Sequence, residues 1–534
     1  MKKGRKLASG ITLSLAVMLA ITACGNNNNN NNAASSPSSS QGSNQGSSQS
    51  ASASTSASKP AKFSASIFDR GAVPADQGTY EDNRWTKWID ENANTDITWV
   101  PITRSQENDK YNVLVASGTA PDTISTYDRN ILARFISQGW AQPIGDAIEQ
   151  YSVEYKQYLS EHPELLPYLT FDGEMYAIAS LRPTRAQTQI WIRQDYLDKL
   201  NLSVPTTIEG LIDVARAFRD GDPDGNGVND TVPIALSGAH GPIIDDLFMA
   251  RSGEWFIENG QATVNAFTGR YEDSMALRKL FYDEGLIHKE FITDQNHAMS
   301  KQNWVTGKAG IMFGTSTDGP TIELFENQPN AKLAAVPALT TKYGVNGYQK
   351  EVPNDILSIV KKNADIEGII KYLDWLLREG WEPLTYGEEG VHYKLVDGQP
   401  VILDQKKWEQ EVSFMEEYRL VHNNITTPES LAASAGDDPV MQEINRLKGE
   451  MIKISEATEY RKDFPYPPTV EEWSAISGQY QKKLEEVTTQ VTIGGPDKTP
   501  EWGIKQMQQE WKNLDGDNIA KKVQAWYEAN KANF

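Results

Sequence analysis

Short apolar runs alternate with helical apolar stripes along the chain from about residue 63 onward. Runs of β-branched and aromatic residues at 63–68, 97–102 and 187–193 predict β-strands, and the runs at 309–314 and 356–360 predict short buried strands. Helical sequence lies between several of these runs. Strands that alternate with helices are typical of α/β lobes.

Apolar residues spaced three or four apart predict the helices. Thr206 and Glu209 form a capping-box pattern, and an apolar stripe at 208–218 follows it. A second stripe occupies 366–377. The tail beyond Lys406 is rich in Glu, Gln, Lys and Trp, and we expect it to be mostly helical and packed against a lobe. A chain with about 470 ordered residues predicts two or three domains.

The only cysteine in the sequence, Cys24, follows a secretory signal. A basic start leads into an apolar run from Leu7 to Ile21, which is shorter than the ~20 residues that a stable membrane span needs. The residues Ile21–Cys24 are similar to a bacterial lipobox, in which the cysteine is acylated, with palmitate the expected lipid. We therefore predict a signal peptide at 1–23 and a lipid-anchored Cys24. The alternative is an ordinary signal peptide, or an uncleaved anchor, with an incidental cysteine.

Composition limits the rest of the chain. Residues 24–62 are mostly Asn, Ser, Gly, Ala and Gln, too polar to offset the entropy of ordering, so we predict a flexible tether. An acylated Cys24 leaves no thiol for disulfides, nucleophilic catalysis or metal binding. The whole chain has 51 basic and 72 acidic residues, a net charge of −21, which disfavours nucleic acid and anionic lipid headgroups as ligands.

Residues 222–230 form the most specific short motif in the sequence. Alternate carboxylate and amide side chains with a glycine at position six, Gly227, follow the spacing of a calcium loop. Position twelve is Pro233 instead of the usual bidentate Glu, so another oxygen must close the shell. We predict a structural Ca²⁺ here, and the alternative is a solvated acidic turn. The predicted ligands are Asp222, Asp224, Asn226, the Val228 carbonyl and Asp230, with Asp220 as a further donor.

Several blocks of sequence resemble one known family, and together they span about residues 63–534. They are Val115–Asp122, Asp172–Ala177, Trp191–Leu200, Asp283–Ile287, Thr306–Met312 and Tyr386–Tyr393. The chain resembles the large extracellular solute-binding lipoproteins of ABC sugar importers, in the branch of LplA and the alginate-oligosaccharide-binding proteins. The loop at 222–230 is similar to a calcium site of this branch, although Thr231 replaces a commonly acidic residue.

The resemblance implies a two-lobed α/β fold, the periplasmic-binding-protein-like fold of type II, with extra C-terminal helices. Its two lobes close about a hinge cleft that holds the ligand. By analogy, lobe one comprises 63–182 plus 340–390, and lobe two comprises 188–335 plus 391–534. The implied partners are a soluble carbohydrate, the membrane permease of an ABC transporter and the membrane that holds the lipid anchor, and we expect a monomer.

Sugars present ring faces and hydroxyl groups, so a receptor needs aromatic surfaces and planar polar groups. For Trp191, packing in the core is an equally good interpretation. For Glu388 and Glu389, the alternative is a solvated turn. For His392, structural hydrogen bonding is the favoured interpretation. The arginines among the candidates suggest an acidic sugar such as a uronic acid. The candidate ligand-binding residues are Tyr127, Arg182, Arg185, Gln187, Gln189, Trp191, Arg193, Trp255, Asn354, Asp355, Tyr386, Glu388, Glu389, His392 and Tyr393.

Two rival functions use similar residues. A secreted glycosidase or lyase would also need carboxylates and aromatic platforms, but Glu388 and Glu389 are neighbours that point to opposite faces of an extended segment. The sequence contains no G-x-S-x-G, H-E-x-x-H or P-loop motif. A cell-surface carbohydrate adhesin would be expected to show repeats, and none is visible. We therefore expect a binding protein rather than an enzyme.

Overall fold

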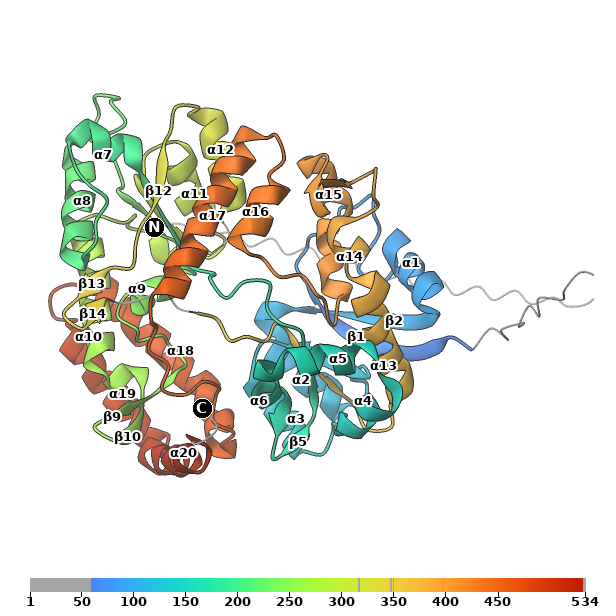
Figure 1. Cartoon of the computed structure of the whole chain (residues 1–534). Helices are drawn as coiled ribbons and strands as arrows, with labels where there is room; N and C mark the ends of the chain where they lie inside the picture. The colour runs from blue at the N-terminus through green and yellow to red at the C-terminus, as the bar shows by residue number, and fades with distance from the viewer. Residues whose placement is uncertain (1–58, 316, 346–347, 349, 397, 532–534) are drawn as a thin grey trace, which may run out of the picture. The chain divides into compact units, whose positions relative to one another are not determined.

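The computed structural model describes residues 59–531, apart from 316, 346, 347, 349 and 397 (Figure 1). The predicted signal peptide, the predicted lipidation site Cys24 and nearly all of the predicted tether lie outside the described residues. Two separate hydrophobic cores organise the described chain, and each surrounds one β-sheet. We call the sheets and helices around these cores lobe one and lobe two.

The sheet of lobe one has five strands in the order β2-β1-β3-β15-β6. The strands β1, β2 and β3 run parallel, whereas β15 runs antiparallel to β3 and β6. The predicted strands at 63–68 and 97–102 are therefore neighbours in one sheet. The strands are β1 (Ala61–Asp69), β2 (Thr95–Thr103), β3 (Thr123–Thr126), β15 (Leu357–Val360) and β6 (Ala177–Ile178), with the small pairs β4 (Thr170–Phe171) with β5 (Glu174–Met175) and β16 (Tyr393–Val396) with β17 (Gln399–Ile402).

Helices cover this sheet, and local capping defines where they begin. Asn83 accepts hydrogen bonds from the backbone N–H groups of Trp85 and Thr86, which starts α1. Aromatic residues fill the core, where the rings of Trp99 and Tyr418 lie 4.8 Å apart. The helices are α1 (Arg84–Ala93), α2 (Glu107–Ala116), α3 (Arg129–Ser137), α4 (Gly145–Tyr151), α5 (Glu154–Glu161), α6 (Leu166–Leu169), α13 (Ile366–Trp375), α14 (Pro383–Tyr386) and α15 (Gln405–Glu411), with 3₁₀ turns η1 (Arg104–Gln106), η2 (Pro163–Leu165) and η6 (Ser413–Tyr418) and the π-helical turn η5 (Leu376–Gly380).

The sheet of lobe two has four strands in the order β12-β7-β11-β8. All five residues of β7 are buried, and this strand runs antiparallel to both β12 and β11. The strand β8 runs parallel to β11. The strands are β7 (Gln189–Arg193), β8 (Ile234–Ala235), β11 (Ile311–Gly314) and β12 (Leu333–Ala335), with the hairpins β9 (Trp255–Glu258) with β10 (Gln261–Val264) and β13 (Thr340–Thr341) with β14 (Gly344–Val345).

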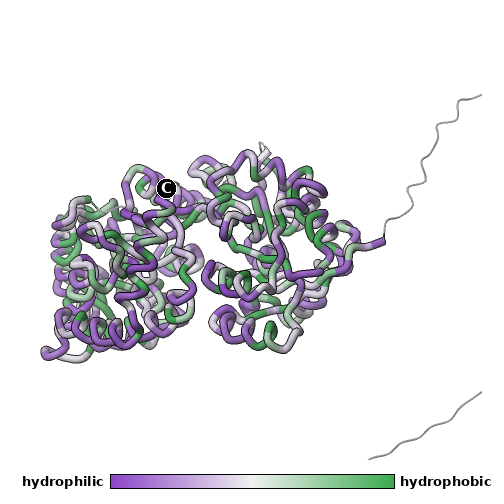
Figure 2. Tube along the Cα trace, turned by 90° about the horizontal axis from the view of Figure 1, so that it is seen from below, coloured by the Kyte–Doolittle hydropathy of each residue, from purple (hydrophilic) through white to green (hydrophobic). Residues whose placement is uncertain are grey.

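The helices of lobe two include the C-terminal tail that the sequence predicts to be helical. Thr207, one residue after the predicted Thr206, caps α8 by accepting the N–H of Gly210 at 2.9 Å. Figure 2 shows hydrophobic stretches inside the folded chain and hydrophilic residues along its outer helices. The helices are α7 (Gln194–Leu200), α8 (Ile208–Asp220), α9 (Pro242–Asp246), α10 (Gly269–Asp283), α11 (Ala298–Val305), α12 (Asp318–Asn327), α16 (Pro428–Ser434), α17 (Pro439–Ala457), α18 (Glu471–Ile493), α19 (Pro500–Asn513) and α20 (Gly516–Asn530), with 3₁₀ turns η3 (Asn265–Phe267) and η4 (Phe291–Thr293).

The residues of the two cores contradict two predicted lobe boundaries. The family resemblance assigns 391–534 to lobe two, but Val412, Phe414 and Tyr418 belong to the core of lobe one. The reason is the aromatic packing of η6 against β2, which the helical pattern of the tail does not reveal. The resemblance also starts the second segment of lobe one at 340, but Leu339 and Tyr348 lie in the core of lobe two, where the Tyr348 hydroxyl donates to the carbonyl of Val336. The other lobe boundaries stay predictions. Within the described part of the chain, no helix combines the length and the apolar character needed to cross a membrane.

Candidate ligand site at the lobe crossings

The described chain passes between the two cores three times. It leaves the core of lobe one after Ala179 and enters that of lobe two at Ile190. It returns between Tyr348 and Leu357, and it crosses again after Val421 on its way to α16 and α17. We call these connections crossing one (180–189), crossing two (350–356) and crossing three (422–430).

Backbone hydrogen bonds join the three crossings to one another. The N–H of Arg182 in crossing one donates to the carbonyl of Pro353 in crossing two at 2.7 Å. The N–H of Thr426 in crossing three donates to the carbonyl of Pro183 at 2.7 Å. These two bonds tie the three connections between the lobes to one another.

A hydrogen-bonded pair of ionisable groups links crossings two and three. Nε2 of His422 lies 3.0 Å from Oδ2 of Asp355, and the N–H of Asn424 donates to Nδ1 of His422 at 3.3 Å. Since Nδ1 accepts, Nε2 carries the proton and donates to the carboxylate. Burial lowers the pKa of His422 below its ordinary value. Burial by itself would raise the pKa of Asp355, but the hydrogen bond from His422 and the nearby arginines outweigh it and lower this pKa.

Tyr127 and Arg182 lie beside this pair. The guanidinium carbon of Arg182 is 5.5 Å from the ring centroid of Tyr127, and that of Arg104 is 4.7 Å from the same ring. Burial, with the charge of Asp355 next in weight, raises the pKa of Tyr127 to about 12. The buried Nε of Arg182 has no hydrogen-bond partner among the described residues. Burial of an unpaired donor costs free energy, and this nitrogen has no accessible surface through which a ligand reaches it in this conformation.

A continuous groove runs along crossing three. Its smaller part, about 320 Å³, is lined by crossing one and the start of α12. Its larger part, about 990 Å³, extends past α16 and α17 to α14 and the β16–β17 hairpin. The two parts share Asp318, Thr426, Leu431 and Lys448, and Nζ of Lys448 lies 2.7 Å from Oδ2 of Asp318. We call the whole the crossing groove.

The larger part of the crossing groove combines aromatic and planar polar side chains. Trp381 and Tyr386 have ring centroids 6.4 Å apart, and the indole N–H of Trp408 donates to the carbonyl of Thr385 at 3.0 Å. Half-exposed rings beside such polar groups suit a ligand with apolar ring faces and many hydroxyls. The polar lining includes Glu382, Lys394, Gln399, Asn423, Asn424, Asp437 and Asp438.

Eight of the fifteen predicted ligand-binding residues lie at the crossings or in the crossing groove. Gln187, Gln189 and Tyr386 line the groove. Gln189 is also held in place, because its Oε1 accepts a hydrogen bond from Oγ1 of Thr317 at 2.5 Å. The other members lie in crossings one and two or beside them: Tyr127, Arg182, Arg185, Asn354 and Asp355.

Three predicted residues instead pack inside lobe two. Trp191 is 2% exposed in the central strand β7, and its indole N–H donates to Oγ1 of Thr317 at 2.6 Å. Arg193 is buried and forms an ion pair with Asp195 at 2.6 Å. Trp255 is 3% exposed, with its ring 5.0 Å from that of Trp473. These side chains serve packing, because none of them lines the crossing groove.

The segment at 388–393 contacts α1, α15 and the groove-lining residues Glu382 and Tyr386. Glu388 is exposed and lies 3.2 Å from Arg84. His392 is fully buried, accepts the N–H of Glu388 at Nδ1 (3.0 Å) and faces Glu411 through Nε2 (3.1 Å). This is the structural hydrogen bonding that the sequence favours for His392. Tyr393 is buried and donates to Glu382 at 3.1 Å, whereas Glu389 is exposed.

Several groove residues were missed by sequence reasoning. Trp381 and Trp408 line the groove, as do Asn423 and Asn424 of crossing three. The run Asn-Asn-Ile-Thr-Thr-Pro at 423–428 is a loop signal that could have revealed this crossing inside a tail predicted to be helical.

The predicted calcium loop has part of the required geometry. The carboxylate of Asp222 accepts the N–H groups of Asn226 and Gly227, each at 3.1 Å. The side-chain amide of Asn226 donates to Asp224 at 2.8 Å and to Asp230 at 3.1 Å, so these two carboxylates converge on one point. A cation at that point would require the Asn226 amide to turn its oxygen inward.

Other contacts of the loop compete with a metal. Asp230 forms an ion pair with Lys308 at 2.6 Å, and Asp220 is engaged by Arg219. Val228, whose carbonyl is one of the predicted ligands, is exposed to solvent in the same loop. Within the described residues, no group of three or more His, Cys, Asp or Glu side chains is arranged to hold a metal ion. The fit to calcium is therefore incomplete in this conformation.

Two α/β lobes, joined by three hydrogen-bonded crossings with a groove along them, define a two-lobed solute-binding fold. The family model for bacterial extracellular solute-binding proteins matches residues 72–383. This chain belongs to that family.

One curated relative and two solved structures are similar to this chain, and the solved structures share its fold. The chain is 30% identical over 329 residues to the polygalacturonan/rhamnogalacturonan-binding protein YtcQ of Bacillus subtilis strain 168, which covers 58% of this chain and 64% of YtcQ. The match thus spans less than two thirds of that relative. The alginate-binding protein AlgQ2, solved without calcium ion, has a TM-score of 0.67 at 21% identity, over 88% of this chain and 98% of AlgQ2. An EF-hand mutant of Streptococcus pneumoniae FusA in complex with fructo-nystose has a TM-score of 0.65 at 18% identity, over 89% of this chain and 100% of that chain.

Proposed function

We propose that this protein captures a soluble oligosaccharide in the crossing groove and delivers it to the membrane permease of an ABC importer. The observation that carries the proposal is the crossing groove itself, where Trp381, Tyr386 and Trp408 stand among amide and carboxylate side chains. The groove follows the crossings, so closure of the lobes about a bound ligand would bury it. The names of YtcQ and AlgQ2 specify carbohydrates, and the FusA variant was solved in complex with fructo-nystose.

A uronate-containing oligosaccharide is the ligand class that we favour. Lys394 and Lys448 line the crossing groove. Arg182, in crossing one, and Arg104 lie outside the groove lining, where both stack on the ring of Tyr127. Guanidinium groups bind carboxylates with two parallel hydrogen bonds. YtcQ is named for polygalacturonan and rhamnogalacturonan, and AlgQ2 for alginate.

The protein is proposed to act on the outer face of the cell membrane, held there by acylated Cys24. This part of the proposal rests on the lipobox-like residues before Cys24 and on the apolar run that precedes them. The Asn- and Ser-rich segment at 24–62 would act as a tether that lets the lobes turn toward the permease.

A calcium ion in the loop at 222–230 completes the proposal. The converging carboxylates of Asp224 and Asp230 and the loop spacing support it. Two similar structures add support, since AlgQ2 was solved without calcium ion and the FusA variant is an EF-hand mutant. To bind the ion, Asp230 would have to exchange its ion pair with Lys308 for the metal. The role of the ion would be structural, because the loop follows α8 and lines neither part of the crossing groove.

The direct test is calorimetric titration of the full chain with neutral and uronate-containing oligosaccharides, followed by mass spectrometry of the recovered ligands. We expect saturable binding of at least one oligosaccharide, tighter for the uronate series, and recovery of every ligand with its bonds intact. Chain shortening would indicate a glycosidase or lyase. Binding only to insoluble cell-wall material would indicate an adhesin, and either result would contradict the proposal.

A further inference from the structure

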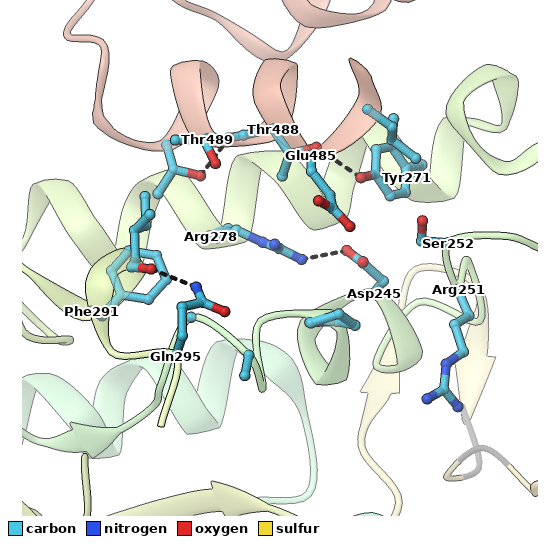
Figure 3. Close-up of a pocket in the computed structure, with 16 residues that line it drawn as sticks. Asp245, Arg251, Ser252, Tyr271, Arg278, Phe291, Gln295, Glu485, Thr488 and Thr489 are labelled. Atoms are coloured by element: carbon cyan, nitrogen blue, oxygen red, sulfur yellow. Dashed lines mark hydrogen bonds and ion pairs between the residues drawn. The ribbon is translucent and has the colours of Figure 1, made fainter. Parts of the chain in front are cut away.

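A second pocket lies inside lobe two, and it shares no lining residue with the crossing groove (Figure 3). It has a volume of about 360 Å³. Its walls come from the segment 238–252, from α10, from the turn at 291–295 and from α18. Because all of these elements belong to lobe two, the pocket does not depend on how far the two lobes are closed.

Arg278 of α10 lies across the centre of this pocket (Figure 3). Its Nη2 donates to Oδ1 of Asp245 at 2.7 Å and to the carbonyl of Gly241 at 2.9 Å. Arg278 as a whole residue is 9% exposed, and its buried Nε has no hydrogen-bond partner among the described residues. A buried donor of this kind costs free energy unless a partner satisfies it. Arg278 lines the pocket, and its bonds to Asp245 and Gly241 hold the guanidinium across it, in position to meet a polar ligand.

The wall opposite Arg278 is formed by α18 and is rich in acceptors. Glu485 is exposed at the mouth, and the hydroxyls of Thr488 and Thr489 line the same wall. The hydroxyl of Thr488 lies 2.8 Å from that of Tyr271, and either can be the donor. One wall thus offers a cationic donor, and the other offers a carboxylate and hydroxyls.

The charge balance and the size narrow the class of ligand. Asp245 pairs with Arg278, the second lining arginine, Arg251, pairs with Glu351, and Glu485 adds a negative charge, so an anionic ligand is disfavoured. A hydroxyl group can accept from a guanidinium and donate to a carboxylate at the same time. Ligand pockets span ~300–1,000 Å³, and this pocket lies at the small end of that range. We propose that it is a binding site for a neutral polyhydroxylated molecule of monosaccharide size.

The test titrates the full chain with D-glucose, D-galactose and D-mannose in turn, by calorimetry or saturation-transfer NMR. We expect saturable binding of at least one sugar with a Kd of about 1–10 mM. Glu485→Gln should weaken it about tenfold, because a charged hydrogen-bond acceptor becomes neutral. Glu486→Gln is the matched control, since Glu486 is the next residue of α18 and does not line the pocket. Thr489→Phe should fill the pocket and abolish binding.

Each alternative result has a clear meaning. Absence of saturable binding for all three sugars would overturn the proposal. Binding that survives both Glu485→Gln and Thr489→Phe but disappears in Trp381→Ala would place the sugar in the crossing groove, and it would overturn the proposal equally. Far-ultraviolet circular dichroism establishes that Thr489→Phe is folded, and Glu485→Gln keeps the test decisive if it is not, because Glu485 is exposed.

Discussion

Two aromatic regions of this protein use the same kinds of side chain in opposite ways. In lobe two, Trp255, Trp473 and Trp511 pack against one another, with the rings of Trp255 and Trp473 5.0 Å apart, and the last two also pack against Tyr480. We call these four residues the tryptophan cluster. All four are buried in the core. In the crossing groove, by contrast, the aromatic rings are half-buried and border amides and carboxylates.

The difference shows what distinguishes a core aromatic residue from a binding one. Trp255 follows a glutamate and Trp381 precedes one, so each tryptophan has a charged neighbour and the two sequence contexts look alike. What separates them is the partner on the open side of the ring, which is another tryptophan for Trp255 and solvent-facing polar groups for Trp381. The tryptophan cluster should therefore govern stability, and the crossing groove should govern affinity.

Truncation of the tryptophan cluster should give the largest effect. Trp255→Ala removes a fully packed indole, and we expect the free energy of unfolding to fall by about 3–5 kcal/mol. The dissociation constant for an oligosaccharide, measured on the folded variant, should stay within about twofold. Urea denaturation followed by tryptophan fluorescence, together with calorimetry, measures both quantities. A stable Trp255→Ala protein that no longer binds ligand would reverse the roles of the two regions.

Calcium, like the tryptophan cluster, should change the stability of the protein and not its affinity for the oligosaccharide. At a free concentration 100 times its dissociation constant, the ion should add about 2.7 kcal/mol, and chelator should remove this increment without weakening the oligosaccharide. Asp224→Asn should abolish the response to calcium. Asp213→Asn is the control, because Asp213 is an exposed residue on the adjacent α8. A melting temperature that chelator leaves unchanged would exclude the metal.

The fold was largely predictable because its signals are local. The runs at 63–68 and 97–102 become β1 and β2, since apolar and β-branched residues in short runs specify strands within their own length. Crossing three was hidden, because it is a short irregular segment between helices and its partner atoms lie in crossing one, more than 200 residues earlier.

The site was less predictable for the same reason. The crossing groove gathers Gln187, Thr315, Tyr386 and Lys448 from four distant parts of the chain. Residue type alone predicted Gln187 and Tyr386, which line the groove, and it equally predicted Trp191 and Trp255, which the fold buries. Burial depends on long-range packing, and single-sequence periodicity does not report it.

Truncation of an aromatic side chain in the crossing groove should weaken ligand binding and leave stability nearly unchanged, which is the opposite of the result expected for Trp255→Ala. We expect Trp381→Ala and Tyr386→Ala each to weaken oligosaccharide binding about tenfold, because a half-buried ring loses its stacking contact with the ligand. Their stability should change by less than about 1 kcal/mol. Trp502→Ala is a matched control, since Trp502 is also half-buried but lies on α19, away from the groove. Equal loss of affinity in all three variants would argue against the groove.

The smallest expected effect concerns pH, and it separates the two regions by their chemistry. Burial lowers the pKa of His422. As the pH falls through about 6.5, this imidazole therefore becomes protonated in the unfolded chain but stays neutral in the folded chain. Stability contributed by neutral His422 is therefore present above pH 6.5 and is lost as the pH falls below it. His240, whose pKa burial lowers to about 4, acts in the same direction, whereas Asp246, whose pKa burial raises to about 7, acts in the opposite one.

Because these contributions overlap, a difference between variants is the informative measurement. His422→Gln preserves a hydrogen-bond donor toward Asp355, and it should reduce the loss of unfolding free energy between pH 7.5 and 5.5 by about 1 kcal/mol. Trp511→Phe, in the tryptophan cluster, should lower stability at both pH values by the same amount, because it removes no ionisable group. Thermal melting at the two pH values tests this prediction: an unchanged pH dependence in His422→Gln would mean that His422 carries no protonation-linked stability.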